Sequence, residues 1–131
     1  MPRRFSREEA DALLPQIAPL LTQIRDLKRK NDETRSSVNE LQGTLKSNGH
    51  SLDVEMARLS RALQSTGAAV NELIERVTGL GVEVKDLEMG LADFLSEREG
   101  REVYLCWKLG EEHVSFWHEL EAGYASREPL D

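Results

Sequence analysis

The chain has 131 residues, which suits one ordinary domain or two small units and excludes a large enzyme scaffold. Apolar residues make up 39% and charged residues 31%, a balance too apolar for a disordered chain and too polar for a membrane protein. The single cysteine, Cys106, excludes an internal disulfide framework and suits a reducing compartment. Pro15 and Pro19 interrupt the apolar run near the N-terminus, so it does not read as a signal or membrane span. We therefore expect a cytoplasmic protein.

The charge is unevenly distributed along the chain. Residues 1–80 carry 12 basic and 11 acidic side chains, whereas residues 81–131 carry 5 basic and 13 acidic ones, so the net charge of -7 resides in the second part. The hydrophobic periodicity changes at the same place, from a helical period to alternation. We expect an α+β protein: a long antiparallel, coiled-coil-like helical hairpin over residues 1–80, then a small acidic β-meander of three to four strands with a C-terminal tail over residues 81–131.

The hairpin is expected to begin with a short helix of its own. Ser6 and Glu9 form the Ser-x-x-Glu pattern that is typical of a capping box. Pro15 lacks a backbone N–H, so it should end this short helix or begin the next one. Two long helices follow, separated by a turn near residues 46–51, where Asn48 and Gly49 are typical turn residues.

Two heptad stripes predict that these long helices pack against each other. The first stripe consists of Ile17, Leu20, Ile24, Leu27, Asn31, Thr34, Val38, Leu41 and Leu45. The second consists of Leu52, Met56, Leu59, Leu63, Thr66, Val70, Leu73, Val77 and Leu80. Residues that face each other in an antiparallel hairpin have a constant sum of numbers, and a sum of 97 pairs every member of the two stripes. A single turn therefore accounts for both.

One layer of this hairpin, Asn31 opposite Thr66, is polar. A polar seam pair commonly fixes the register, because a slipped alignment would bury it against apolar side chains; a hinge or a partner contact is the alternative. Each helix alone buries only a narrow stripe, so we expect a homodimer in which two hairpins form a four-helix bundle, with the Asn31–Thr66 layer at its seam.

Four segments after Gly81 alternate between apolar and polar residues and predict strands. They cover residues 82–85, 90–95, 101–107 and 113–118. We expect Val103, Leu105 and Phe116 on the core face, with Tyr104, Cys106 and Trp117 on the opposite face. An aromatic face of this kind favours binding to a protein partner. The residues expected to make that contact are Tyr104, Trp107, Trp117, His118 and Arg127.

Several segments of the chain are similar to a known family. They are Gly81–Phe94, Gly100–Glu111, Phe116-Trp117-His118, Gly123–Leu130 and the opening Phe5–Pro15. Together they resemble the bacterial family called domain of unknown function 2203. The resemblance implies a small cytoplasmic bacterial protein and carries no activity with it. The residues that match its motifs are Lys85, Asp86, Gly90, Asp93, Phe94, Arg101, Cys106, Trp107, Gly110, Glu111, Trp117, His118, Gly123 and Arg127.

A metal site is one alternative function for the sheet. Imidazole and carboxylate groups suit a divalent transition metal, and His118 with Asp86 or Asp93 from neighbouring strands is the expected core of such a site. Glu111 and Cys106 are further candidate ligands. His113 and His118 are five residues apart, so on a straight strand they face opposite sides and do not share a metal. The other interpretation of His118 is an edge residue that hydrogen-bonds a carboxylate.

Three other activities receive weaker support from the sequence. Cys106 is a nucleophile only if its thiol is exposed beside a histidine, and otherwise it is an inert sheet residue. Asp86, Asp93 and Glu111 could do acid–base work in a cleft, but their spacing selects none of them, and Asp86 is more simply a turn residue that bonds nearby backbone. Basic residues gather near the middle of the hairpin, but acids are interspersed, so we do not expect nucleic-acid binding. The basic residues are Arg25, Lys28, Arg29, Lys30, Arg35, Arg58 and Arg61.

Taken together, these features favour a non-enzymatic cytoplasmic scaffold that acts as a homodimer, has no resident cofactor and docks an unidentified protein. The alternative is a divalent-metal-binding protein or a small metal-dependent hydrolase built on His118 with Asp86 or Asp93. The two hypotheses differ in whether the candidate side chains converge at one place in the fold.

Overall fold

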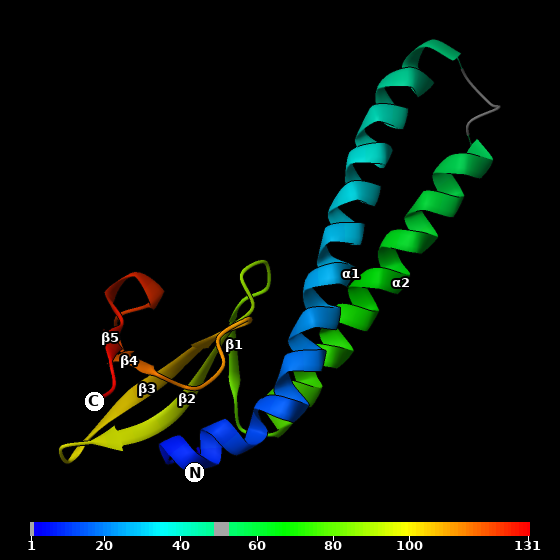
Figure 1. The fold of residues 1–131 in the computed structure, drawn as a ribbon. Helices are drawn as coiled ribbons and strands as arrows, with labels where there is room; N and C mark the ends of the chain where they lie inside the picture. Colours follow the sequence, from blue (N-terminus) through cyan, green and yellow to red (C-terminus); the bar gives the residue numbers. More distant parts are fainter. Residues whose placement is uncertain (1, 49–52) are drawn as a thin grey trace.

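The computed structural model describes residues 2–48 and 53–131, with the side chains of residues 45–48 outside the description. Helix α1 (Arg7–Asn48) and helix α2 (Asp53–Gly79) form an antiparallel hairpin (Figure 1). A five-stranded antiparallel sheet follows, made of β1 (Glu83–Asp86), β2 (Leu91–Arg98), β3 (Arg101–Lys108), β4 (Phe116–Glu119) and β5 (Glu128–Pro129). The expected α+β class, with a helical hairpin before a β-meander, is confirmed.

The first helix does not divide at Pro15. Ser6 and Glu9 form the expected capping box, in which the Ser6 hydroxyl accepts from the Glu9 N–H and the Glu9 carboxylate accepts from the Ser6 N–H. The helix then continues through Pro15 and Pro19 in one element of 42 residues, so the prediction of a separate short helix is wrong. A proline inside a helix removes a hydrogen bond and favours a bend, and Figure 1 shows α1 changing direction within its first turns. The buried side chains on both sides of the bend offset the lost bond.

The polar layer of the hairpin lies where the stripes place it. The Asn31 amide donates to the Thr66 hydroxyl at 2.7 Å and to the Leu63 carbonyl at 3.2 Å. Thr66 is buried, and its hydroxyl also contacts the Ala62 carbonyl, so the polar groups of this layer are satisfied inside the hairpin. These contacts support the register role of Asn31. The predicted layer of Leu45 and Leu52 and the centre of the predicted turn lie outside the described residues, while Lys46 to Asn48 belong to α1.

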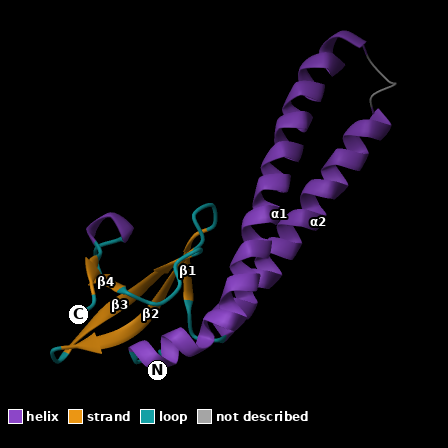
Figure 2. Ribbon diagram, in the orientation of Figure 1, coloured by secondary structure: helices purple, strands orange, loops and turns teal. Residues whose placement is uncertain are grey.

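The sheet is a simple meander in which neighbours in sequence are neighbours in space, from β1 to β5 (β1 to β4 in Figure 2, β5 in Figure 1). Its turns use residues with positive φ, including Gly90 (φ 71°) and Gly100 (φ 81°), a conformation that glycine adopts without steric cost. A short 3₁₀ helix, η2 (Tyr124–Ser126), connects β4 to β5. The sequence predicted four of the five strands and left β5 in the tail, because two residues ending in a proline carry no alternation signal.

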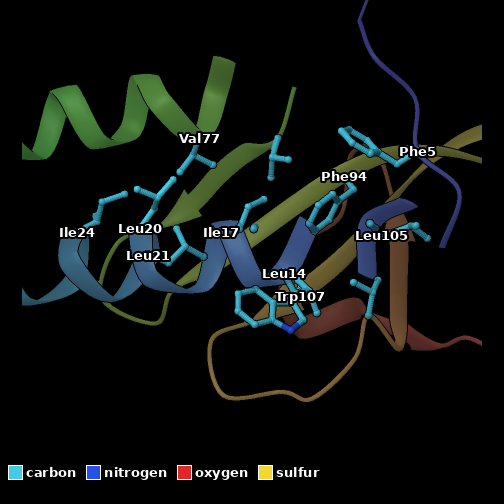
Figure 3. Close-up of a cluster of buried hydrophobic side chains, with 14 of the residues drawn as sticks. Phe5, Leu14, Ile17, Leu20, Leu21, Ile24, Val77, Phe94, Leu105 and Trp107 are labelled. Carbon is cyan, nitrogen blue, oxygen red and sulfur yellow. The ribbon is translucent and has the colours of Figure 1, made fainter. Parts of the chain in front are cut away.

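One core joins the helices to one face of the sheet. Figure 3 shows Leu14, Ile17 and Leu21 of α1 close to Phe94, Leu105 and Trp107 of the sheet, with Val77 of α2 beside them. The Phe5 ring packs edge-to-face on Phe94 with ring centroids 5.4 Å apart. The hairpin covers this face of the sheet with apolar side chains, so polar side chains of the central strands gather on the opposite face. No helix among the described residues is both long enough and apolar enough to cross a membrane.

Truncation of Phe94 should reveal how much stability this core supplies. Phe94 is fully buried, so Phe94→Ala should lower the free energy of unfolding by about 3–5 kcal/mol through lost apolar contact and the cavity left behind. Leu120→Ala is the matched control, because Leu120 is 43% exposed and should change stability by no more than about 0.5 kcal/mol. Urea denaturation of the two variants measures both values, and equal small losses would contradict this core.

Candidate metal centre

The side chains of β3 alternate between the face that packs on the hairpin and the opposite face. Val103, Leu105 and Trp107 face the hairpin and are buried in the core. Tyr104 and Cys106 therefore project from the opposite face, which we call the outer face. Strand pairing brings β2 and β4 to the two sides of β3, with Asp93 opposite Cys106 and His118 opposite Tyr104. The outer face thus collects an acid, a thiol and an imidazole from three adjacent strands.

These three side chains converge on one point. A carboxylate oxygen of Asp93, the sulfur of Cys106 and a ring nitrogen of His118 all lie within 4.8 Å of one another. Strands are spaced about 4.8 Å apart, so Asp93 and His118 start from strands roughly 10 Å apart and meet over the small Cys106 side chain between them. All three residues are 3% exposed or less. Within the described part of the chain, they are the group of potential metal ligands that the fold assembles.

Hydrogen bonds determine which nitrogen of His118 points into the centre. Nδ1 lies 2.7 Å from the carbonyl oxygen of Glu119, and a carbonyl only accepts, so Nδ1 carries a hydrogen and donates it. Nε2 lies 2.9 Å from Oδ2 of Asp93. This contact holds one proton, which resides either on the carboxyl or on the ring. A histidine whose Nδ1–H bonds a backbone carbonyl while Nε2 faces an acid has the orientation that metal-bound histidines commonly show.

The second carboxylate oxygen of Asp93 is the unusual atom of the centre. Oδ1 is fully buried and makes no hydrogen bond to any described residue. Burial raises the pKa of the Asp93 carboxyl, whereas His118 and the Cys106 thiol act in the opposite direction. An unpaired buried oxygen costs free energy, because it has lost its water without gaining a partner. A bound cation between the three side chains would supply that partner.

The thiol of Cys106 is held in its neutral form. Burial and the nearby Asp93 charge raise the pKa of Cys106 to about 12, although Arg127 acts in the opposite direction. A thiol that stays protonated near neutral pH is a poor nucleophile, because the thiolate is the reactive species. The raised pKa therefore disfavours nucleophilic catalysis by Cys106, and a metal bound there would have to displace the thiol proton.

Two other candidate ligands lie outside the centre. Oδ1 of Asp86 accepts from the Met89 N–H at 2.7 Å, so Asp86 closes the turn between β1 and β2. Glu111 accepts from the Lys108 N–H at 2.8 Å and pairs with the Arg127 guanidinium. Both carboxylates thus stabilise turns and the tail. The alternative interpretation of Asp86 as a turn residue accounts for its contacts.

The predicted aromatic face is arranged differently from the expectation. Trp117 pairs with Leu105 across β3 and β4, so it faces the helices, while Phe116 pairs with Cys106 on the outer face. The predicted faces of these two residues are therefore interchanged. The reason is that β4 begins only at Phe116, and the preceding segment does not continue the strand alternation that the sequence interpretation assumed.

The five residues predicted to contact a partner are spread over both faces. Trp107 is 2% exposed and Trp117 is 8% exposed, and both belong to the core. Tyr104 and Arg127 are half-buried on the outer face, and His118 belongs to the centre described above. Binding of a protein partner stays a prediction, but its expected aromatic surface is smaller than the alternation indicated.

Cations cover the aromatic rings of the outer face. Lys85 lies 4.8 Å from the centre of the Tyr104 ring, and Arg127 lies over both Phe116 (3.9 Å) and Tyr124 (4.4 Å). A bond to Glu83 and burial raise the pKa of Tyr104 to about 12, so its hydroxyl stays neutral beside the centre. Phe116 and Tyr124 were not predicted from the sequence to lie under these cations. A prediction that β4 begins at Phe116 would have placed this residue on the outer face, opposite Cys106.

The fold and the buried cluster define a small α+β protein with a candidate metal centre on the outer face of its sheet. The model of the family described as "Uncharacterized conserved protein (DUF2203)" matches residues 3–130. The chain therefore belongs to the DUF2203 family, as the resemblance of its motifs indicated. No curated protein and no solved structure matches the chain.

The reactivity of Cys106 should report its burial. In the folded protein without metal, its modification by a disulfide reagent at neutral pH should be at least about 100-fold slower than in the urea-unfolded chain, because the native thiol is buried and its pKa is about 12. The rate of thiol release, followed by absorbance, measures this ratio. A native rate equal to the unfolded rate would contradict the described position of Cys106 and revive its nucleophilic role.

Proposed function

We propose that this protein binds a divalent transition metal at Asp93, Cys106 and His118. The observation that carries the proposal is the convergence of three different ligand types within 4.8 Å, with one buried carboxylate oxygen left unpaired. A thiolate, an imidazole and a carboxylate together suit zinc and similar metals better than calcium or magnesium, which prefer oxygen ligands.

Charge balance supports a divalent ion. A carboxylate and a thiolate contribute two negative charges, and a neutral histidine contributes none, so a divalent cation makes the centre neutral. The metal would replace the proton between Asp93 and His118 and the proton of the Cys106 thiol. Metal binding is then coupled to the release of protons from these side chains, so the affinity for the metal should rise with pH.

The geometry is compatible with zinc-like coordination after small side-chain adjustments. Bonds of about 2.0–2.3 Å in a tetrahedral site place neighbouring ligand atoms roughly 3.5 Å apart. The contact of 2.9 Å between His118 and Asp93 would open slightly, and the longer separations within the 4.8 Å group would close. The free Oδ1 atom of Asp93 can serve as a fourth donor if the carboxylate binds through both oxygens. Because all three residues are almost fully buried, we propose metal binding rather than metal-dependent hydrolysis.

Metal analysis with matched histidine variants tests this proposal. The wild-type protein, loaded with Zn²⁺ and desalted, should retain about one equivalent of metal. Asp93→Asn preserves the shape of the side chain but removes its charge, and it should weaken binding by at least about 100-fold, or about 2.7 kcal/mol. His118→Ala should have a similar effect. His113→Ala is the control, because the His113 side chain is 63% exposed and lies outside the centre.

Metal content is measured by elemental analysis, and affinity by competition with a chelator of known strength. Wild-type protein that retains no metal would refute the function. Wild-type affinity in Asp93→Asn would refute the assigned site even if the protein binds metal elsewhere. Circular dichroism of each variant separates loss of a ligand from loss of the fold.

We also propose that the protein is a homodimer in the cytoplasm. The half of the hairpin that extends beyond the sheet (residues 31–44 and 53–66; Figure 1) supports pairing of two copies. Its seam residues Val38, Leu41, Met56 and Leu63 are only half-buried, and Val54 is 79% exposed. Packing of two hairpins into a four-helix bundle would cover these side chains. A cytoplasmic location would keep the free thiol of Cys106 reduced.

Sedimentation equilibrium tests the dimer. The wild-type protein should have the mass of two chains at micromolar concentration, and Val54→Lys should raise the dissociation constant of the dimer by about 10-fold or more, because a lysine there would have to be desolvated at the interface. Leu120→Lys places the same charge on an exposed apolar residue of the sheet unit and should leave the mass unchanged. A concentration-independent monomer mass for the wild type would refute the dimer.

A further inference from the structure

Arg127 reaches the outer face of the sheet from the C-terminal segment. It follows η2 (Tyr124–Ser126), and its backbone N–H donates to the Tyr124 carbonyl. The next residues form β5 and pair with β4, and the Leu130 N–H bonds the Ser115 carbonyl at 2.8 Å. The backbone on both sides of Arg127 is therefore anchored, so its side chain projects from a defined position.

The guanidinium of Arg127 is held from three directions. Nη1 donates to Oε1 of Glu111 at 3.0 Å, and Nη2 donates to Oε2 of the same carboxylate. The Phe116 ring centre lies 3.9 Å from the guanidinium carbon, and the Tyr124 ring centre lies 4.4 Å from it. Only 12% of the side chain is exposed. This arrangement fixes the planar group in one orientation.

That orientation places the guanidinium beside the strand position of Cys106. Phe116, which lies under the guanidinium, is the direct cross-strand partner of Cys106. Burial raises the pKa of the Cys106 thiol, and Arg127 is near enough to act in the opposite direction. Two of the five N–H groups of the guanidinium serve Glu111, which leaves donors for the sulfur. Glu111 therefore acts on the centre indirectly, by orienting Arg127.

We propose that Arg127 is a positioning residue of the metal centre, which donates an N–H···S hydrogen bond to Cys106 and keeps this sulfur in place as a thiolate ligand. The inference rests on the proposed metal-binding function. Asp93 and Cys106 would place two anions side by side in the bound state, and the guanidinium of Arg127 would add a positive charge next to Cys106. Groups that contact a metal ligand in this way commonly change metal affinity by about 10- to 100-fold.

The same contact couples the metal to the C-terminal segment. If Arg127 strengthens metal binding, then bound metal must strengthen the attachment of the segment by the same factor, because the two equilibria are linked. The segment that carries Arg127 would thus respond to occupancy of the centre. Lysine cannot take over this role, since it lacks the planar fork that binds Glu111 and stacks on the two rings.

Cobalt substitution tests the proposal directly. Co²⁺ bound to a thiolate gives a charge-transfer absorption that reports the Co–S bond. We expect Arg127→Gln and Arg127→Lys to bind Co²⁺ about 10- to 100-fold more weakly than the wild type and to shift or weaken that absorption. Arg98→Gln is the control: Arg98 also stacks on an aromatic ring, Trp117, at 5.0 Å, but it lies away from the sulfur. It should leave affinity and spectrum unchanged.

The outcomes separate the two proposals. Wild-type protein that binds no Co²⁺ refutes the metal-binding function itself. A wild type that binds Co²⁺, together with Arg127 variants of the same affinity and spectrum, refutes only the role of Arg127. A structural role alone would lower the thermal stability of the variants without changing the Co–S absorption of the bound protein.

A second measurement needs no variant. Hydrogen exchange of the wild-type protein, with and without Zn²⁺, should show slower exchange of the amides of residues 124–130 when metal is bound. The amides of residues 53–66, in the far half of the hairpin, should exchange at the same rate in both samples. If Zn²⁺ binds and the rates in residues 124–130 do not change, the coupling through Arg127 does not exist, even if the Arg127 variants do not fold.

Discussion

The packing of the hairpin on one face of the sheet determines what the other face can do. Leu14, Ile17 and Leu21 bury Leu105 and Trp107, and this contact forces the intervening residue of β3, Cys106, to the opposite side. Asp93 and His118 lie on that same face, because they pair with Cys106 and Tyr104 of β3. A shift of one residue in the register would bury the carboxylate among apolar side chains of the core, so core packing and the centre cannot be changed independently.

The centre itself cannot be explained by stability alone. A buried carboxylate, imidazole and thiol lose their hydration on folding, and well-packed apolar residues of similar volume are commonly as stabilising or more so. Here the loss is only partly offset, because the proton between Asp93 and His118 satisfies Oδ2 while Oδ1 stays unpaired. A divalent cation, as proposed above, would resolve this imbalance, since it would bond the free oxygen and balance two anionic ligands. A purely structural histidine–carboxylate pair would leave the buried Oδ1 atom of Asp93 without a partner.

Much of the fold could be predicted from the sequence because its signals are local and repeated. The heptad stripes extend over many turns, and the Asn31–Thr66 contact shows that the constant sum of residue numbers gave the correct register. A helix break at Pro15 was predicted from the local cost of a proline alone. The burial of Ile17 and Leu21 stabilises the helix across the bend, so it continues through Pro15. The two-residue strand β5 carries no pattern of its own and forms only because the tail returns to β4.

The site was harder to predict because it depends on pairing between strands. His118 and Asp93 were identified as possible partners by residue type, and Cys106 as a further ligand, but spacing in the sequence could not separate them from Asp86 and Glu111. That separation comes from the register, in which Asp93 faces Cys106 directly while Asp86 lies at the end of β1. Arg127 was predicted to lie on a partner surface, yet the tail folds it onto Phe116, the cross-strand neighbour of Cys106. A residue contributed by an irregular tail can be placed only once the strand that anchors that tail is known, and for this chain that strand is β5.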